Sequence, residues 1–369
     1  MRTVIDSNWK VVKGFKTHEF MVYSAYYDAR NTNKPHIRVF GVTRSINPEK
    51  VLCRLFYDYN QENFETKHDN NNIHFMNDDA FFRDVNGKIS LILNEAHLMM
   101  VKMGLDFVYT PPKQFKNDSY HSCDITCPLY DPKNPRLANK RIPVAISILP
   151  RSSPGSLIDY KLPVLNSENG GTGTYVAAKN EVGLCVKPIH SNYDDWVELV
   201  SFIELNKILG VSKFIVYNES ISENVNCVLK YYEQKENIVT ILSWDLVTKF
   251  KNKNARISNR GVMSSLNDCF YRNMNEYQYL FSVDLDEFII PHMHETLPEM
   301  LKYLHSTDVK YLDRHARQKY VKNNIQNTTN SNIITSYNFL NGFFYHHDGK
   351  SFTVSSCEFQ RLQFFANNI

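Results

Sequence analysis

The chain of 369 residues (43.1 kDa) is too long for one small hydrophobic core and suits two packed domains. Its composition, 43% hydrophobic and 22% charged with 13 Gly and 14 Pro, is that of a globular protein and excludes collagen-like and linker-like chains. Because 42 basic residues stand against 39 acidic ones, the net charge of +3 indicates neither nucleic acid nor an anionic membrane as a partner.

The first part of the chain has the pattern of short β-strands. Runs rich in β-branched and aromatic residues alternate with turns of Asn, Pro and Lys. Residues 60–78 are mostly polar, which indicates a long surface loop. We therefore predict a β-rich, sandwich-like domain over residues 1–150. Its clearest strands are expected at residues 19–27, 37–42, 51–57 and 142–149.

Residues 151–180 are a predicted connection between two domains, because Ser, Pro and Gly are concentrated at its start and end. The segment Gly170-Gly-Thr-Gly-Thr174 resembles a phosphate-binding loop. It lacks the Lys-Ser/Thr of a Walker loop, however, and a strand rather than a helix is predicted after it. A linker or surface loop is therefore favoured over a nucleotide site.

Strands alternate with helices after residue 180. In the first predicted helix, the apolar residues from Trp196 to Ile203 have the i, i+3, i+4, i+7 spacing of one buried face. The second helix follows Ser220-Ile-Ser-Glu223, which has the spacing of a capping box. The alternation predicts an α/β domain with a doubly wound, mostly parallel sheet over residues 181–369. Its strands are expected at residues 182–189, 213–217, 238–242 and 279–283.

The cysteines do not form a recognisable framework. Cys123 and Cys127 lack a second Cys or His pair at zinc-site spacing, so a zinc site is not favoured. An odd number at low density favours buried free thiols, and no disulfide pairing follows from the sequence. Three glycosylation sequons, at Asn117, Asn218 and Asn327, support a secretory location only weakly. The seven cysteines are Cys53, Cys123, Cys127, Cys185, Cys227, Cys269 and Cys357.

Two aspartates, Asp284 and Asp286, come directly after the fourth α/β strand. Ligands of open α/β sheets bind at the carboxyl ends of the strands. If the segment is extended, both carboxylates project to the same side and repel each other unless a cation neutralises them. Mg²⁺ or Mn²⁺ prefers such oxygen ligands and can bind a substrate diphosphate.

Two alternatives apply to this D-x-D motif. It could be a solvated acidic turn or a helix N-cap, which Asp residues often form. It could also be the nucleophile motif of a phosphohydrolase of the haloacid-dehalogenase type, but that motif follows the first strand of its domain. Three strand–helix units precede Asp284, and this favours the D-x-D of a nucleotide-sugar transferase.

Several motifs, in order along residues 20–290, resemble glycosyltransferase family 92. They are Phe20-Met-Val-Tyr-Ser-Ala-Tyr-Tyr-Asp-Ala-Arg30, Cys127-Pro-Leu129, the Trp196 helix with the following Leu209–Tyr217 segment, Asn267-Asp-Cys269 and Val283-Asp-Leu-Asp-Glu-Phe288. The resemblance implies a GT-A type catalytic domain, a UDP-sugar donor (UDP-galactose in characterised relatives), Mn²⁺ or Mg²⁺, and inversion at the anomeric carbon. It also implies a glycan acceptor on a glycoprotein or glycolipid.

The resemblance further implies a location in the Golgi, because relatives are usually type II Golgi membrane proteins. Residues 1–16 lack the apolar segment of a secretory signal, and no stretch of about 18 apolar residues is present. The membrane anchor expected from the family is therefore not recognised in this sequence.

The D-x-D motif supplies the predicted metal site. By resemblance, Asp284 and Asp286 would hold the metal and contact the donor, with Asp286 the favoured direct ligand. Glu287 extends the motif as the catalytic candidate, either acting itself or orienting its neighbours. Weaker candidates for a third metal ligand are His292, His294, His346 and His347.

Four further residues are predicted to contact the UDP-sugar. Lys187 and Asn218, at the ends of the first two α/β strands, lie where such folds hold the uridine, although glycosylation at Asn218 would conflict with this role. Arg260 could stabilise the departing UDP, with a solvated basic loop as the alternative. Asp268 matches the Asn-Asp-Cys segment of the family, with a solvated helix residue as the alternative.

The predicted function is a metal-dependent inverting glycosyltransferase that moves a hexose, expected to be galactose, from a UDP-sugar to a glycan. The C-terminal segment of the family, a basic strand followed by Val-His, is not recognisable after Cys357. We therefore expect a C-terminus that is truncated relative to the family. The alternative function is a glycan-binding or UDP-sugar-binding pseudoenzyme of the same fold.

Overall fold

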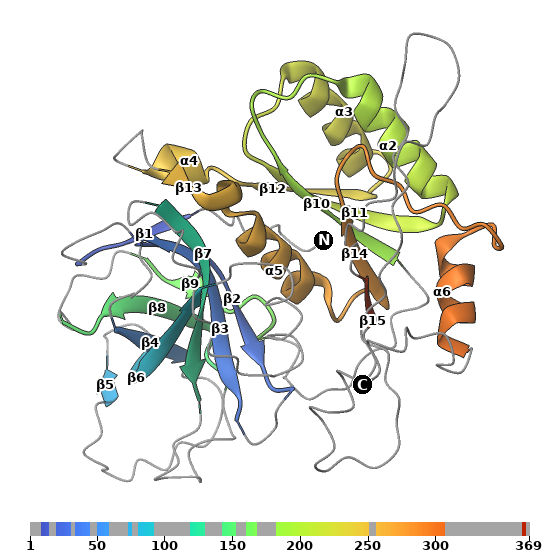
Figure 1. Ribbon diagram of the computed structural model, residues 1–369. Coiled ribbons are helices and arrows are strands. Elements are labelled where there is room, and N and C mark those ends of the chain that lie inside the picture. Colours follow the sequence, from blue (N-terminus) through green and yellow to red (C-terminus); the bar gives the residue numbers. More distant parts are fainter. Residues whose placement is uncertain are drawn as a thin grey trace.

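A computed structural model shows two sheets with one long helix between them (Figure 1). Nothing is described for the residues outside the following ranges. The structure describes residues 9–14, 20–30, 34–44, 50–58, 73–75, 80–91, 119–129, 142–152, 160–167, 182–250, 256–306 and 364–366.

The N-terminal sheet has ten strands, and all pairings among its long strands are antiparallel. Its order is β1-β2-β3-β7-β6-β4-β8-β9, with β5 beside β6 and β13 beside β7. The strands are β1 (Lys10–Val12), β2 (Phe20–Asp28), β3 (His36–Arg44), β4 (Val51–Asp58), β5 (Ile73–Phe75), β6 (Ala80–Leu91), β7 (Ser119–Pro128), β8 (Ala145–Pro150), β9 (Leu162–Pro163) and β13 (Arg256–Ile257).

The predicted sandwich is wrong, because this sheet is one curved half-barrel. β6 pairs with β4 up to Gly87 and with β7 from Lys88 onward, so a single strand joins what would be two sheets. A side chain at Gly87 would collide with the sulfur of Cys53, so only glycine fits at this junction. After β9, the Leu165 N–H donates to the Ala25 carbonyl of β2 at 3.0 Å. This bond brings the chain after the last strand of the sheet order back to β2, near the first strand.

Three predictions for the connecting segments have different outcomes. Residues 160–167, within the predicted linker 151–180, belong to the half-barrel through β9 and the bridge of Val164 to Ala25. The predicted loop at 60–78 contains β5. The glycine-rich segment Gly170–Thr174 lies outside the described residues.

The second sheet confirms the predicted strand–helix alternation. Its order is β12-β11-β10-β14-β15, in which the first four strands are parallel and β15 is antiparallel to β14. The strands are β10 (Val182–Ile189), β11 (Val211–Asn218), β12 (Val239–Ser243), β14 (Tyr279–Val283) and β15 (Phe364–Ala366). The helical elements are α2 (Trp196–Ile208), α3 (Glu223–Gln234), α4 (Leu246–Lys249), η3 (Ser258–Gly261), α5 (Val262–Asn273) and α6 (Leu297–Ser306).

The helices begin within a few residues of the predicted signals, but the expected caps, Asp194 or Asn192 for α2 and Ser220 for α3, are wrong. Asp195 caps α2 by accepting from the Glu198 N–H at 2.9 Å, and Gly210 follows the helix with a φ of +92° that suits glycine. Ser222, within the predicted capping segment, accepts from the Val225 N–H and opens α3.

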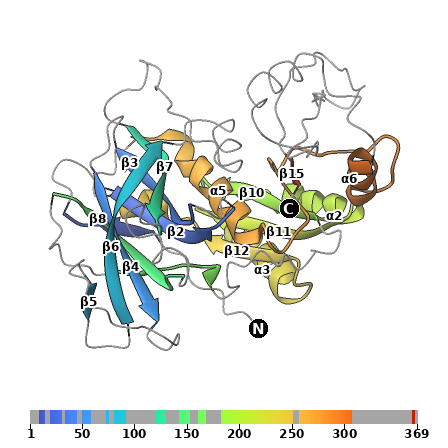
Figure 2. The same ribbon diagram turned by 90° about the horizontal axis from the view of Figure 1, so that it is seen from below.

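Both faces of the parallel sheet are buried. On one face, Leu184 and Phe214 pack with residues of α2, α3 and α6. On the other face, Cys185 and Ile215 pack with α5 and with residues of the half-barrel such as Met21. Figure 2 shows α5 between the two sheets, and this helix therefore joins the two domains through one continuous apolar core.

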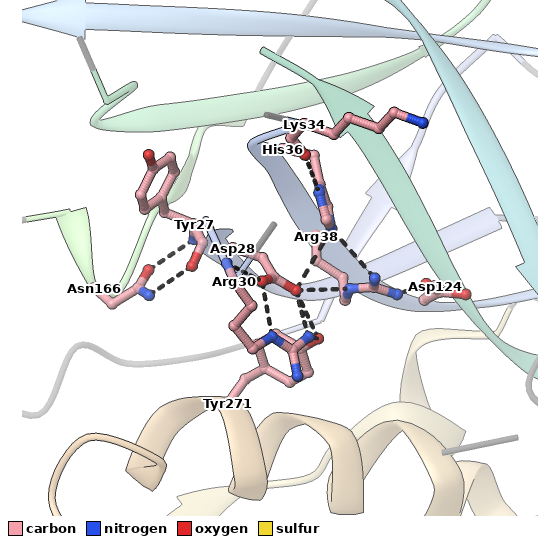
Figure 3. A network of polar contacts seen from close by, with 9 residues as sticks. All are labelled: Tyr27, Asp28, Arg30, Lys34, His36, Arg38, Asp124, Asn166 and Tyr271. Carbon is pink, nitrogen blue, oxygen red and sulfur yellow. Dashed lines mark hydrogen bonds and ion pairs between the residues drawn. The ribbon is translucent and has the colours of Figure 1, made fainter. Parts of the chain in front are cut away.

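A buried polar network also connects the N-terminal sheet to α5 (Figure 3), and we call this region the joint between the domains. The Asp28 carboxylate, at the end of β2, accepts hydrogen bonds from Arg30 and from the Tyr271 hydroxyl of α5. His36 Nε2 lies 3.5 Å from it, and Arg38 lies 3.7 Å away. Burial on its own raises the pKa of Asp28, but the hydrogen bonds and charges of Arg30 and His36 outweigh it and hold the pKa well below its usual value.

The lowered pKa of Asp28 predicts that the free energy of unfolding decreases in acid. Because the folded pKa lies below the unfolded value of about 3.9, Asp28 stabilises the fold above that pH. This contribution is lost as the pH falls below about 4 towards the folded pKa. In urea unfolding at stepwise lower pH, the wild type should lose more unfolding free energy between pH 5 and pH 3 than Asp28→Asn does. Equal losses would contradict this assignment.

Four cysteines form two disulfides, so the preference for free thiols is wrong for them. Cys53 of β4 pairs with Cys127 of β7, and Cys185 of β10 pairs with Cys269 of α5. Cys123 is buried and free. Both bonds join residues that are distant in sequence but adjacent in the fold, which local spacing cannot reveal.

No helix among the described residues is both long enough and apolar enough to span a bilayer.

Candidate functional site

The strand order of the parallel sheet reverses at β10. The strands β11 and β12 lie on one side of it and β14 lies on the other. In open α/β sheets, ligands bind at such a reversal, beside the carboxyl ends of the strands. Most of the predicted site residues lie in the last residues of β10, β11 and β14 or in the loops that follow them.

The D-x-D segment forms a turn directly after β14. The Glu287 N–H donates to the Asp284 carbonyl at 3.0 Å, and the Asp284 N–H donates to Glu287 Oε2, also at 3.0 Å. An extended segment, in which Asp284 and Asp286 would project to the same side, is not what the structure shows, because the chain bends where sheet pairing ends. Glu287 therefore holds this turn, which is the orienting role considered above; its catalytic role stays a prediction.

Lys187 and Asp284 are brought together by the parallel pairing of β10 and β14. Val186 lies opposite Val283 in the register, so the next residue of each strand shares the sheet edge. The Lys187 Nζ lies 2.8 Å from Asp284 Oδ1, and both side chains remain partly exposed. The pair places a cation and an anion side by side at this edge of the sheet.

Asp286 is exposed, and it lies near enough to Tyr193 for its charge to act on that phenol together with the charges of Glu198 and Asp195. Tyr193, in the loop after β10, donates to Glu198 Oε2 at 2.6 Å. Burial, this hydrogen bond and the negative charges of Asp195 and Asp286 raise the pKa of Tyr193. The phenol therefore stays protonated, and the surrounding negative field attracts cations.

Arg260 lies near the carboxyl end of β11. Its Nη1 donates to Glu219 Oε1 at 2.6 Å, and Glu219 directly follows Asn218, the last residue of β11. Asn218 pairs with Ile189 of β10 in the sheet register. The structure therefore brings two predicted donor-contacting residues, Asn218 and Arg260, to one edge of the sheet.

Asp268 lies in a different environment. Its side chain is 0% exposed, and its oxygens accept from Tyr26 and Tyr217 at 2.6 Å each and from Arg272 at 3.0 Å. Both carboxylate oxygens are thus occupied in the joint between the domains. This position gives no support to the predicted nucleotide contact, and the alternative of a solvated helix residue is wrong.

Comparison with known proteins bears on the same region. Residues 180–354 match the family model of glycosyltransferase family 92. The chain carries a glycosyltransferase family 92 domain. This domain contains the whole reversal site, whereas the N-terminal motif at residues 20–30 lies outside the matched range.

Two curated relatives from Caenorhabditis elegans resemble the chain over shorter stretches. The β-1,4-galactosyltransferase galt-1 is 29% identical over 113 residues, which is 30% of this chain and 25% of that protein. The glycosyltransferase family 92 protein F13G3.3 is 26% identical over 131 residues, which is 34% of this chain and 26% of that protein. The matched segments therefore span about a quarter of each relative.

A cation at the D-x-D motif would need ligands from the substrate in addition to those of the protein. Among the described residues, no three His, Cys, Asp or Glu side chains lie close enough together to hold a metal ion. Mg²⁺ is commonly bound by one or two carboxylates together with substrate phosphates, and Mn²⁺ shares the preference for oxygen ligands. Asp284 and Asp286 supply such carboxylates. Of the histidine candidates, His294 packs against the Tyr303 ring, and His346 and His347 lie outside the described residues.

Sequence reasoning missed two polar residues of this site. Tyr193 follows a strand and precedes a helix, and nothing in its local pattern distinguishes it from an ordinary loop tyrosine. Glu219 stands inside the Asn218 sequon, and the sequence pattern indicates no other role for it. The one available signal was its position directly after a predicted strand.

Proposed function

We propose that the chain is a metal-dependent glycosyltransferase that transfers galactose from UDP-galactose to a glycan acceptor with inversion. The observation that carries the proposal is the grouping of Lys187, Asp284 and Asp286 at the sheet reversal inside the family 92 domain. The parallel order β12-β11-β10-β14, with helices on both faces, supports a GT-A type fold.

Each residue has a proposed part in donor binding. Asp284 and Asp286 would hold the metal, which when bound neutralises charge on the diphosphate and on the departing UDP. Lys187 adds positive charge at the end of β10, and Arg260 adds it near the end of β11. These charges would stabilise the negative charge that develops on the leaving group. Asn218 offers an amide at the expected position of the uridine.

The two disulfides support a location in the secretory pathway, because such bonds persist in oxidising compartments. A Golgi location and a glycoprotein or glycolipid acceptor are part of the proposal and follow from the family.

The direct test is the effect of Asp286→Asn on metal-dependent UDP binding. The amide keeps the shape of the side chain but removes the charge that a cation needs. By calorimetry, UDP affinity in Mn²⁺ should fall at least about tenfold, or about 1.4 kcal/mol. Asp194→Asn is the matched control, because it removes a negative charge from the exposed loop before α2 without touching the motif. Unchanged affinity in a folded Asp286→Asn protein would rule out the metal role.

Turnover separates the enzyme from the binding protein considered as the alternative. A transferase releases UDP from UDP-galactose when metal and a glycan acceptor are present, and a binding protein releases none. Measuring UDP release from a panel of UDP-sugars, with Mn²⁺ and with EDTA, also tests the donor sugar.

A further inference from the structure

Glu219 is a buried carboxylate at the edge of the proposed donor site. Its side chain is 8% exposed, and its backbone N–H donates to the Ile189 carbonyl at 3.0 Å, which fixes it beside the end of β10. Oε1 accepts from Arg260, whereas Oε2 is buried and has no hydrogen-bond partner among the described residues. A buried carboxylate with a single charged partner is poorly compensated for the loss of water.

The backbone that carries Arg260 is also held in an unfavourable conformation. Asn259 and Arg260 have φ values of 44° and 48°, and Gly261 follows with 74°. The left-handed region suits glycine and is tolerated by asparagine, but it is unfavourable for Arg260. Non-glycine residues in this conformation persist only where their surroundings hold them, and they concentrate at functional sites.

The surroundings that hold this bend are visible. The indole N–H of Trp244 donates to the Arg260 carbonyl at 3.0 Å. Trp244 is fully buried and packs edge-on against the rings of Trp9, Tyr23 and Tyr217. Trp244 of this aromatic cluster holds the backbone of Arg260, and Glu219 holds its guanidinium.

The Arg260 side chain remains 40% exposed although it is fixed at both ends. A guanidinium has several N–H donors in a rigid fork that matches phosphate oxygens. Its Nη1 group donates to Glu219, and no other described residue forms a hydrogen bond with this guanidinium. An oriented, partly exposed guanidinium beside the sheet reversal is suited to a diphosphate.

We infer that Glu219 is a positioning residue that presents Arg260 to the diphosphate of the donor. This inference rests on the proposed function and adds a residue to it. Glu219 acts through Arg260 rather than on the substrate, because its free oxygen is buried. A purely structural ion pair is the competing explanation, and it makes different predictions for stability and for binding.

The test compares UDP with uridine, which lacks the phosphates. Glu219→Gln removes the charge and weakens the hold on Arg260, so UDP affinity in Mn²⁺ should fall about tenfold. Arg260→Ala should produce a loss of similar size, and the double variant should lose little more, because the two residues act as one unit. Uridine affinity should stay unchanged in all three variants.

The urea midpoint of Glu219→Gln distinguishes the two explanations, because loss of a purely structural ion pair would lower it. Glu219→Gln removes a poorly compensated buried charge and leaves an exposed arginine that water can solvate, so the urea midpoint should stay equal or rise. Glu236→Gln is the matched control, because Glu236 forms an ion pair of 2.7 Å with Lys207 at the last turn of α2, on the opposite edge of the sheet. This control should leave UDP affinity unchanged.

The outcomes separate the two proposals. If the wild type binds UDP but Glu219→Gln binds it equally well, or if Glu219→Gln unfolds more easily with normal UDP affinity, the positioning role is overturned and the proposed function stands. If the wild type binds no UDP in Mn²⁺, both are overturned. Reduced UDP affinity with normal uridine affinity and an unchanged or higher urea midpoint supports the positioning role.

Discussion

Asp268→Asn is expected to lower the free energy of unfolding by about 3–5 kcal/mol, because it breaks a buried ion pair by removing one partner. The Arg272 guanidinium keeps its charge and loses its counter-ion. Burial raises the pKa of Tyr26 and of Tyr217, so both hydroxyls remain protonated and donate to Asp268. The amide nitrogen of an asparagine would face one of these donors, so a hydrogen bond is lost together with the charge.

Urea unfolding followed by tyrosine and tryptophan fluorescence measures this loss. Glu223→Gln is the control, because Glu223 is an exposed carboxylate in the first turn of α3, where a change costs no more than about 1 kcal/mol. A loss in Asp268→Asn as small as that of the control would mean that the joint does not depend on this carboxylate.

The buried position of Asp268 could not be predicted from local sequence patterns. Its partner Tyr26 is 242 residues away in the chain, and no local pattern links the two. By resemblance to the family, the Asn267-Asp-Cys269 motif predicts that Asp268 contacts the nucleotide. The structure shows that Tyr26, Asp28 and Asp268 join the two domains instead.

The parallel sheet could be predicted because its elements have local signatures. Periodicity, caps and apolar runs distinguish α2 and α3 from the strands that flank them. The half-barrel could not be predicted from such patterns, since its shape depends on β6 changing partners at Gly87. Strands with the same alternation of apolar residues can form a sandwich or a half-barrel.

The candidate site was predicted in part for the same reason. Parallel strands end at a common edge, and this rule predicts a ligand site at the ends of the strands that carry Lys187, Asn218 and Asp284. The turn at Asp284 and the partner of Arg260 depend on single hydrogen bonds to Glu287 and Glu219. Such bonds have no signature in composition or spacing.

The disulfide between Cys185 and Cys269 is expected to be the second large contribution to stability. It joins β10 to α5 and closes a loop with a sequence separation of 84 residues. Removing a native disulfide costs about 2–5 kcal/mol, in the chain-entropy model because the unfolded chain gains freedom. The bond lies on the sheet face that packs against α5, two residues before Lys187, so its loss also loosens the strand that carries this site residue.

The double variant Cys185→Ala, Cys269→Ala tests this contribution without leaving a reactive thiol behind. Its unfolding free energy should be about 2–5 kcal/mol below that of the wild type in oxidising buffer. Cys227→Ala is the control, because Cys227 is exposed and free, and it should unfold like the wild type. Under non-reducing conditions, peptide mapping of the wild type should recover a peptide that joins Cys185 to Cys269. Recovery of both cysteines as free thiols, with equal stability of the double variant, would contradict the bond and would leave Cys53–Cys127 as the one disulfide among the described residues that supports a secretory location.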